Sequence, residues 1–476
     1  MPITAWVFSI LIFLFPVLAV AEGNGAHGDP IAPVILGVTG ILFFAVLGRF
    51  AARKLGQPSV LGELLMGLLL GNLAYYFRLD LILVLREGPA IFSIVEQAFS
   101  NGHSLPEAAH LILQGDTATR VLTALQGPHG AQLLQIAQTV DVFSRYGVIF
   151  LLFLVGLDTS VQEMRAVGAA SMRVAFVGVL LPFVFGFEAA RLLMPELSVN
   201  TDLFIAATLG ATSVGITARV LQELKQDRSR EARVILGAAV MDDVIGLVML
   251  AIVSGIIVSG AVQFGNVLKI IVLALAFLGS AIWLGPYLLH GAIRLVSRLD
   301  LIEAKMFVSY LFVMVLAWTA NLVGLATIVG AFTAGLILHD AYFHNWGDHR
   351  QHRYSIRDLI MPLEVILVPI FFVLMGIQVK LETFLDWHVL QMAGGLLIAA
   401  VLGKLLCGYV AGRGLNRLAI GIGMLPRGEV GLIFASIGKS LGVISDALFS
   451  SVVLMVLVTT LMAPPLLKLA MRKPQA

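Results

Sequence analysis

Charged residues and cysteine are scarce in this sequence. Only 13% of its 476 residues are charged, whereas soluble domains carry about 25%, so the chain cannot surround itself with a solvated surface. Its single cysteine, Cys407, excludes a disulfide framework and a cysteine-based metal cluster. A formal net charge of +2 excludes an electrostatic nucleic-acid binder, because no basic face is available to neutralise phosphates.

Long hydrophobic runs are abundant instead. Hydrophobic residues make up 59% of the chain, and apolar runs of about 20 residues, long enough to cross a bilayer, recur from end to end. The sequence therefore predicts an all-α integral membrane protein with about thirteen transmembrane helices. The predicted spans cover residues 32–50, 58–77, 142–157, 174–193, 202–221, 233–259, 266–293, 306–321, 323–339, 359–379, 388–411, 418–438 and 446–468.

The loops between these spans predict the orientation. Lysine and arginine gather in every second loop: residues 219–233 contain five of them, whereas residues 260–265 contain none. Because positive loops stay on the cytoplasmic side, we expect an inner-membrane protein with its N-terminus outside and its C-terminus in the cytoplasm. Residues 1–21 end in small residues after an apolar run and predict a signal peptide, the alternative being a retained helix.

Ionisable residues lie deep within predicted spans at three places, one of which is Arg427 and Glu429 in the span 418–438. Asp242 and Asp243 follow one another in the span 233–259, and Lys404 lies in the span 388–411. A charge at this depth is costly unless it faces a cavity and has a partner, so it indicates a functional site. Consecutive helical residues point about 100° apart, so the two aspartates face different neighbours. One can pair with Lys404 while the other serves as an oxygen ligand for a small cation; the alternative is a salt bridge that only holds helices together.

Two spans contain residues that interrupt helices. In the span 202–221, two glycines flank Thr212 and Ser213, whose oxygens could coordinate a cation. Small residues of this kind also serve ordinary helix packing. Non-helical backbone is tolerated inside a membrane only against protein or a cavity.

The span 418–438 is interrupted by glycines, a proline, Arg427 and Glu429. It is the twelfth predicted span and 202–221 is the fifth. An odd separation makes the two run in opposite directions, as an inverted repeat requires. Paired interrupted helices indicate the binding site of a secondary transporter.

Several ordered motifs carry a family resemblance. The stretches 210–221, 235–247 and 424–432 (GATSVGITARVL, ILGAAVMDDVIGL and MLPRGEVGL) resemble the second monovalent cation:proton antiporter family, and within it the NapA-like Na⁺/H⁺ antiporters. The stretches 57–64 and 369–377 extend the match, which covers nearly the whole chain after residue 31.

The resemblance implies a homodimer whose protomers each contain a dimerisation domain and a moving core domain. It implies core halves at 142–259 and 380–476, separated by linker and dimerisation helices at 260–379, after two first helices in 31–77. The segment 78–141 is then an unusual extracytoplasmic insertion, for which we expect short amphipathic helices on the outer surface.

The resemblance also assigns roles to the candidate residues. Asp243 matches the principal cation- and proton-binding aspartate, and Asp242 matches the neighbour that pairs with the core lysine, here Lys404. Thr212 and Ser213 match the first unwound crossover, and the following pair matches the second: Arg427 and Glu429. An aspartate pair of this kind goes with electrogenic exchange in the family.

The expected function is exchange of Na⁺ for protons through an elevator movement, with no cofactor and no enzymatic activity. K⁺ or Li⁺ remains an alternative cation because selectivity depends on the spacing of oxygen ligands. A passive cation channel is a further alternative. An intramembrane aspartyl protease is excluded, because its two carboxylates must meet from separate helices.

Overall fold

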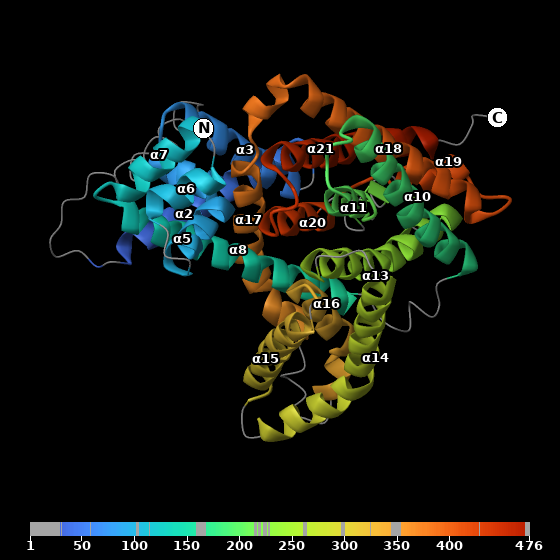
Figure 1. Cartoon of the computed structure of the whole chain (residues 1–476). Helices are drawn as coiled ribbons and strands as arrows, with labels where there is room; N and C mark the ends of the chain where they lie inside the picture. Colours follow the sequence, from blue (N-terminus) through green and yellow to red (C-terminus); the bar gives the residue numbers. More distant parts are fainter. Residues whose placement is uncertain are drawn as a thin grey trace. The chain divides into compact units, whose positions relative to one another are not determined.

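Figure 1 shows the computed structural model of the chain, in which the described residues are 29, 31–57, 59–100, 104–113, 115–158, 168–213, 217, 220–221, 226, 229–259, 264–296, 300–323, 325–343, 354–427 and 429–471. In this described part the chain forms helices and no strands, so the all-α prediction is confirmed there. The predicted signal peptide, residues 1–21, lies outside the described residues.

The chain folds into two compact units. The first comprises residues 1–147 and 365–381, and the second comprises residues 148–364 and 382–476. Helices α8 and α17 therefore contribute to both. The helices of the first unit are α2 (Ala32–Lys54), α3 (Ser59–Tyr76), α4 (Asp80–Arg86), α5 (Gly88–Ser100), α6 (Leu105–Ile112), α7 (Gly115–Gln126), the start of α8 (Gly130–Asp158) and the end of α17 (Ile356–Ile377).

The second unit contains the rest of α8 and α17 and the remaining helices. These are α10 (Ala169–Leu193), α11 (Val199–Thr208), α13 (Arg230–Ser259), α14 (Phe264–Leu295), α15 (Leu301–Leu322), α16 (Thr327–Ile337), η1 (Asp340–Phe343), α18 (Trp387–Cys407), η4 (Gly408–Ala411), α19 (Arg417–Gly423), α20 (Glu429–Ser440) and α21 (Asp446–Ala470), with the short η3 (Leu381–Leu385) at the boundary.

Ten helical segments of the described chain are long and apolar enough to cross a membrane. Each of the remaining predicted spans also contains helix: 202–221 contains most of α11, 323–339 contains α16, and 418–438 contains α19 and most of α20. The structure thus places helix in every predicted span, while the number of membrane crossings stays a prediction.

Small residues let α3 and α17 approach closely in the first unit. A Cβ atom at Gly67 would overlap the carbonyl oxygen of Val373, and one at Gly376 would overlap that of Leu64. Such contacts are typical of membrane helices, which associate through close packing because lipid supplies no hydrophobic driving force between them.

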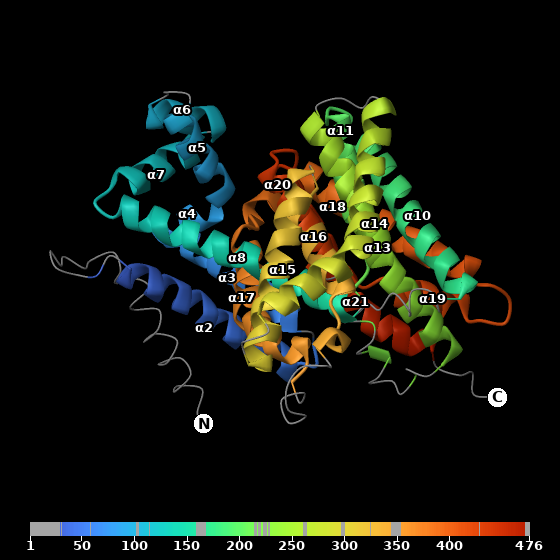
Figure 2. The ribbon, with the colours of Figure 1, turned by 90° about the horizontal axis from the view of Figure 1, so that it is seen from below.

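In its described residues, the segment 78–141 forms α4, α5, α6, α7 and the first turns of α8, which Figure 2 shows gathered together. Each helix is short and buries apolar residues, such as Ile91 in α5 and Val121 in α7. The prediction of short helices is correct, while their place on the outer surface stays a prediction. A capping box of Ser104 and Glu107 begins α6.

Partly buried polar contacts join this segment to the helices around it in the first unit. The Lys380 ammonium lies 2.6 Å from a carboxylate oxygen of Glu87. Arg86 donates to the side-chain oxygen of Asn72 at 3.2 Å, and the Asn72 amide donates to the carbonyl of Val379 at 3.0 Å. The segment is therefore fixed to the ends of α3 and α17.

Several helices differ in length from the prediction, and α8 and α16 are the most informative. Helix α8 begins at Gly130 rather than at residue 142, because Leu133, Ile136 and Val140 bury one face of its extension.

Helix α16 has only 11 residues where the prediction had a full span at 323–339. At 1.5 Å per residue it covers roughly half of a 30 Å hydrocarbon layer. The backbone on both sides of α16 is extended, which an apolar run alone does not reveal.

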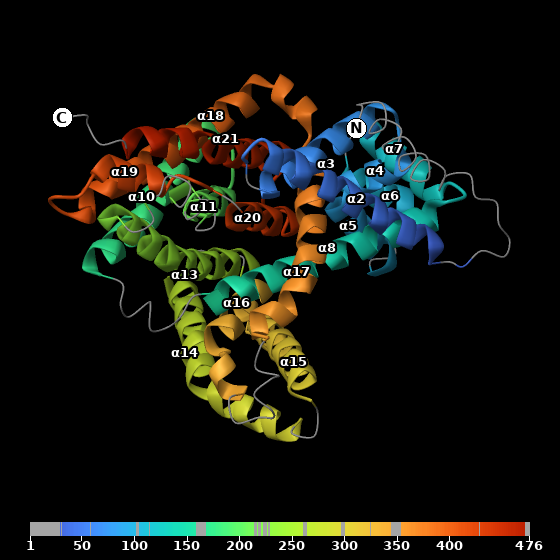
Figure 3. The same cartoon turned by 180° about the vertical axis from the view of Figure 1, so that it is seen from behind.

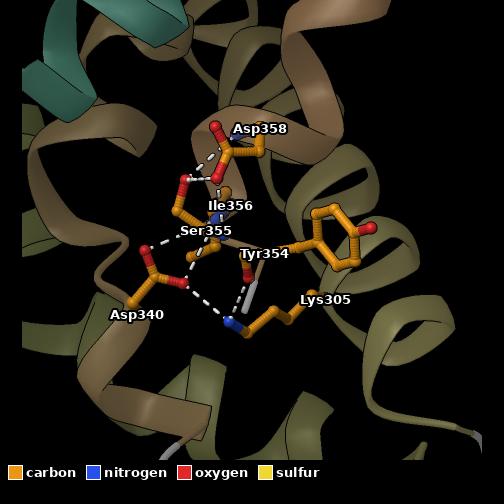
Figure 4. Close-up of polar contacts among 6 residues, drawn as sticks. All are labelled: Lys305, Asp340, Tyr354, Ser355, Ile356 and Asp358. Atoms are coloured by element: carbon orange, nitrogen blue, oxygen red, sulfur yellow. Dashed lines mark hydrogen bonds and ion pairs between the residues drawn. The ribbon is translucent and has the colours of Figure 1, made fainter. Parts of the chain in front are cut away.

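A buried lysine ties α15 to the start of α17 in the second unit. The Lys305 ammonium donates at 2.8 Å both to the Asp340 carboxylate and to the carbonyl of Tyr354 (Figure 4). Asp340 also accepts from the amide of Ile356, the first residue of α17, and Asp358 accepts from the Ser355 hydroxyl at 2.7 Å. This end of α17 is therefore capped by side chains rather than left open.

Candidate functional site

The predicted lysine and one predicted aspartate form an ion pair in the second unit. The Lys404 ammonium lies 3.1 Å from one carboxylate oxygen of Asp242 and 3.4 Å from the other. Both side chains are 0% exposed. The pair joins α18 to α13, and its two residues are 162 positions apart in the sequence. The predicted pairing of Lys404 with an aspartate of α13 is thus present.

Close packing of α18 on α10 positions Lys404. A Cβ atom at Gly403 would lie 2.6 Å from the backbone nitrogen of Pro182 in α10, so only glycine fits there. Gly178 of α10 faces Lys404 and Cys407 at ordinary contact distance: a Cβ atom there would lie 3.6 Å from the ammonium. The Lys404 side chain therefore extends from α18 at a point where α10 and α18 pack closely through glycines.

The first predicted interruption begins where α11 ends. Helix α11 stops at Thr208, a turn follows, and residues 211–213 have no regular structure. Figures 1 and 3 show α11 from opposite sides, surrounded by α10, α13 and α20. The interruption frees backbone carbonyls from the helical ladder. One of them, the carbonyl of Gly210, accepts a hydrogen bond from the Lys404 ammonium at 2.7 Å.

The second predicted interruption lies against the first. Helix α19 ends at Gly423 and α20 begins at Glu429, with non-helical backbone over residues 425–427. Its carbonyls accept hydrogen bonds from the first interruption. The donors are the Thr212 hydroxyl to Met424 at 3.2 Å, the Ser213 amide to Pro426 at 2.8 Å and the Thr217 hydroxyl to Gly423 at 2.8 Å. The two broken helices therefore satisfy each other's backbone.

Arg427 reaches back across the crossing. Its terminal NH1 donates to the carbonyl of Ala211 at 3.2 Å, and the side chain is buried. Among the described residues, its Nε and its other terminal nitrogen have no hydrogen-bond partner. Neighbouring carbonyls of the first interruption, at Gly210 and Ala211, thus hold two cationic side chains from different elements.

Five of the predicted site residues meet in one buried region: Asp242, Lys404, Thr212, Ser213 and Arg427. The backbone of Asp243 lies in α13 and that of Glu429 begins α20, but both side chains lie outside the described part of the structure. This region, where the two interruptions cross, is called the crossing site below.

Thr217 was missed by the sequence analysis. It belongs to the motif 210–221, four residues after Ser213, and is fully buried. That spacing would have placed it on the same helical face as Ser213. The carbonyls of Gly210 and Ala211 were also missed, because no side chain marks which backbone groups an interruption leaves free.

Comparison with known proteins agrees with the resemblance. The family described as "Sodium/hydrogen exchanger, transmembrane" matches residues 117–473. The chain is 33% identical over 466 residues to the high-affinity Na⁺/H⁺ antiporter NhaS3 of Synechocystis sp., an alignment that covers 96% of this chain and 94% of that protein. It is 28% identical over 436 residues to the Na⁺/H⁺-K⁺ antiporter GerN of Bacillus cereus, covering 90% of this chain and 94% of that protein.

A solved structure has the same fold. The sodium proton antiporter MjNhaP1 of Methanocaldococcus jannaschii superposes with a TM-score of 0.57 and 17% sequence identity, covering 92% of this chain and 96% of that one. The family match and the similarity to NhaS3 confirm the expectation of a transporter rather than an enzyme. With its multiple apolar helices and its match over residues 117–473, the chain belongs to the sodium/hydrogen exchanger family of transmembrane cation:proton antiporters.

Proposed function

We propose that this protein is a secondary active antiporter that exchanges Na⁺ for protons. The observation that carries the proposal is the Lys404–Asp242 pair, fully buried where two interrupted helices cross. Taking two charges out of water costs several kcal/mol per ion, so such a pair is weak evidence of a purely stabilising role. Its place beside freed backbone carbonyls favours ion exchange instead. The antiporter relatives support Na⁺ as the cation.

The residues at the crossing site have the chemistry for both substrates. Asp242 is occupied by Lys404, so we assign the principal cation- and proton-binding role to its neighbour Asp243. Carboxylate, hydroxyl and carbonyl oxygens are the ligands that hard cations prefer, and Thr212 and Ser213 lie at the first interruption to supply them. Arg427 stabilises the crossing through Ala211, and Glu429 is assigned a supporting role by the resemblance.

Competition for the same carboxylates couples the two fluxes. Moving an ionised carboxylate through a hydrophobic barrier costs much free energy. The cost is much smaller when a proton or a cation neutralises the carboxylate. The site therefore crosses the barrier when loaded with Na⁺ or with protons, and neither substrate moves without the other. No cofactor takes part in this scheme.

The movement itself is proposed to be of the elevator type. Residues 142–259 and 380–476 form the two core halves, which carry the crossing site, and residues 260–379 provide linker and dimerisation helices of a homodimer. The contacts that bind α10, α11, α13 and α18–α21 around the crossing site support a core that moves as one body. The paired aspartates and the lysine support electrogenic exchange.

The placement in the cell follows from the loop charges. We propose an inner-membrane protein surrounded by lipid, with a cleaved signal peptide at residues 1–21, an outer N-terminus and a cytoplasmic C-terminus. The insertion at 78–141 then lies outside the cell membrane. Cysteine-accessibility labelling of loops 219–233 and 260–265 from either side tests this orientation, and labelling of 219–233 from outside would contradict it.

K⁺/H⁺ exchange is the second candidate, because the relative GerN is a Na⁺/H⁺-K⁺ antiporter. A passive cation channel is a weaker one. An assay with purified protein in liposomes that contain a pH-sensitive dye distinguishes Na⁺/H⁺ exchange, K⁺/H⁺ exchange and a passive channel. We expect an imposed Na⁺ gradient to drive protons in the opposite direction, faster than equal gradients of K⁺ or Li⁺, and an imposed membrane potential to change the rate.

Each alternative has its own outcome in that assay. Faster proton movement with K⁺ than with Na⁺ would identify a K⁺/H⁺ antiporter. Cation flux without proton countermovement would identify a channel and reject the proposal. Liposomes without protein give the leak that must be subtracted.

A further inference from the structure

One carbonyl of the second interruption accepts a hydrogen bond from a helix outside the crossing. The carbonyls of Gly423, Met424 and Pro426 accept from the first interruption, as described above. The carbonyl of Arg427 instead accepts from the hydroxyl of Thr460, which lies in the middle of α21. Helix α21 thus takes part in holding the crossing site.

Several threonines of the described helices use their hydroxyls locally. Thr459, the neighbour of Thr460, donates to the carbonyls of Met455 and Val456 within α21, at 2.9 and 3.1 Å. The same bond to the residue four positions earlier is made by Thr123, Thr139, Thr319 and Thr333. This is the usual arrangement for a helical threonine. Thr460 departs from it by reaching another segment.

Water cannot easily replace this contact. Thr460 is 4% exposed and Arg427 is 1% exposed. A buried carbonyl that loses its donor bears the full desolvation cost of an unsatisfied polar group. Removing the hydroxyl therefore leaves Arg427 free to move to a position where its carbonyl is satisfied.

Arg427 connects this contact to the ion pair. Its side chain donates to the carbonyl of Ala211, next to the Gly210 carbonyl that accepts from Lys404, and Lys404 in turn pairs with Asp242. We propose that Thr460 is a positioning residue for cation exchange: by fixing the Arg427 backbone, it sets the geometry of the crossing site. The proposal rests on the proposed function and adds a residue that it does not include.

Neighbouring threonines provide matched variants for the test. Thr460→Val removes the hydroxyl at nearly constant volume, Thr459→Val does the same one position earlier, and Thr460→Ser restores the hydroxyl. In proteoliposomes, we expect Thr460→Val to raise the KM for Na⁺ roughly fivefold, the effect of one lost neutral hydrogen bond. Thr459→Val and Thr460→Ser should keep the original KM. Equal KM values for both valine variants would overturn the proposal.

Amide hydrogen exchange supplies a readout that does not depend on transport. In Thr460→Val, peptides covering residues 417–427 should exchange faster than in the unsubstituted protein, while Thr459→Val leaves them unchanged. Faster exchange with an unchanged KM would also overturn the proposal, since Thr460 would then be structural only. If the unsubstituted protein exchanged no alkali cation, the proposed function would fail, and amide exchange alone would decide whether Thr460 holds the interruption.

Discussion

At the scale of residues, the ion pair between Lys404 and Asp242 could be predicted because a charge buried in a membrane needs a partner of opposite sign. The third contact of the lysine, with the Gly210 carbonyl, could not be predicted. Every residue has a carbonyl, and only the backbone path at the interruption determines which one is free. The partner of Arg427, the Ala211 carbonyl, was unpredictable for the same reason.

Removing one member of the ion pair should be worse than removing both. Lys404→Met leaves Asp242 buried without its cation, which we expect to lower the free energy of unfolding by about 3–5 kcal/mol. Combining it with Asp242→Asn removes the uncompensated charge and should recover part of that loss. Thermal unfolding of each purified variant in detergent measures the loss in the single variant and its recovery in the double variant. A double variant no more stable than Lys404→Met would show that the two side chains do not depend on each other.

At the scale of elements, the interrupted helices followed from glycine and proline inside apolar runs, and the structure ends α11 and α19 at those places. Helix lengths were less predictable. The extension of α8 back to Gly130 and the shortness of α16 depend on neighbouring helices and on extended flanking backbone. A hydrophobic run in the sequence indicates only that a segment avoids water. A short helix enclosed by protein and a full membrane span both do so, and the run cannot tell them apart.

The contact of α10 with α18 gives a paired prediction for this scale. Gly403→Ala places a Cβ atom 2.6 Å from the Pro182 nitrogen, and the backbone cannot yield, so we expect a loss of about 1–3 kcal/mol in unfolding free energy. Gly178→Ala meets Cys407 Sγ at 3.5 Å, an ordinary contact, and should unfold at nearly the original temperature. Equal unfolding temperatures for the two variants would contradict the close approach of these helices.

At the scale of the whole molecule, composition was enough to predict a multi-pass helical membrane protein, and ordered motifs were enough to indicate its family. The division into two compact units was not foreseen, because it cuts through α8 and α17 rather than between spans. The segment 78–141 was equally hard to predict. Its glycines and prolines indicated short helices, but the ion pair of Glu87 and Lys380 that fixes it joins residues almost 300 positions apart.

The central claim, that acids of α13 carry both the metal ion and the proton, is tested most directly by isotopic Na⁺ uptake into acid-loaded proteoliposomes. Uptake and the accompanying alkalinisation are followed together in the unsubstituted protein, in Asp243→Asn and in Thr459→Val as a folded control. We predict that Asp243→Asn abolishes both signals while Thr459→Val keeps both. Proton-coupled Na⁺ uptake that persists in Asp243→Asn would contradict the account.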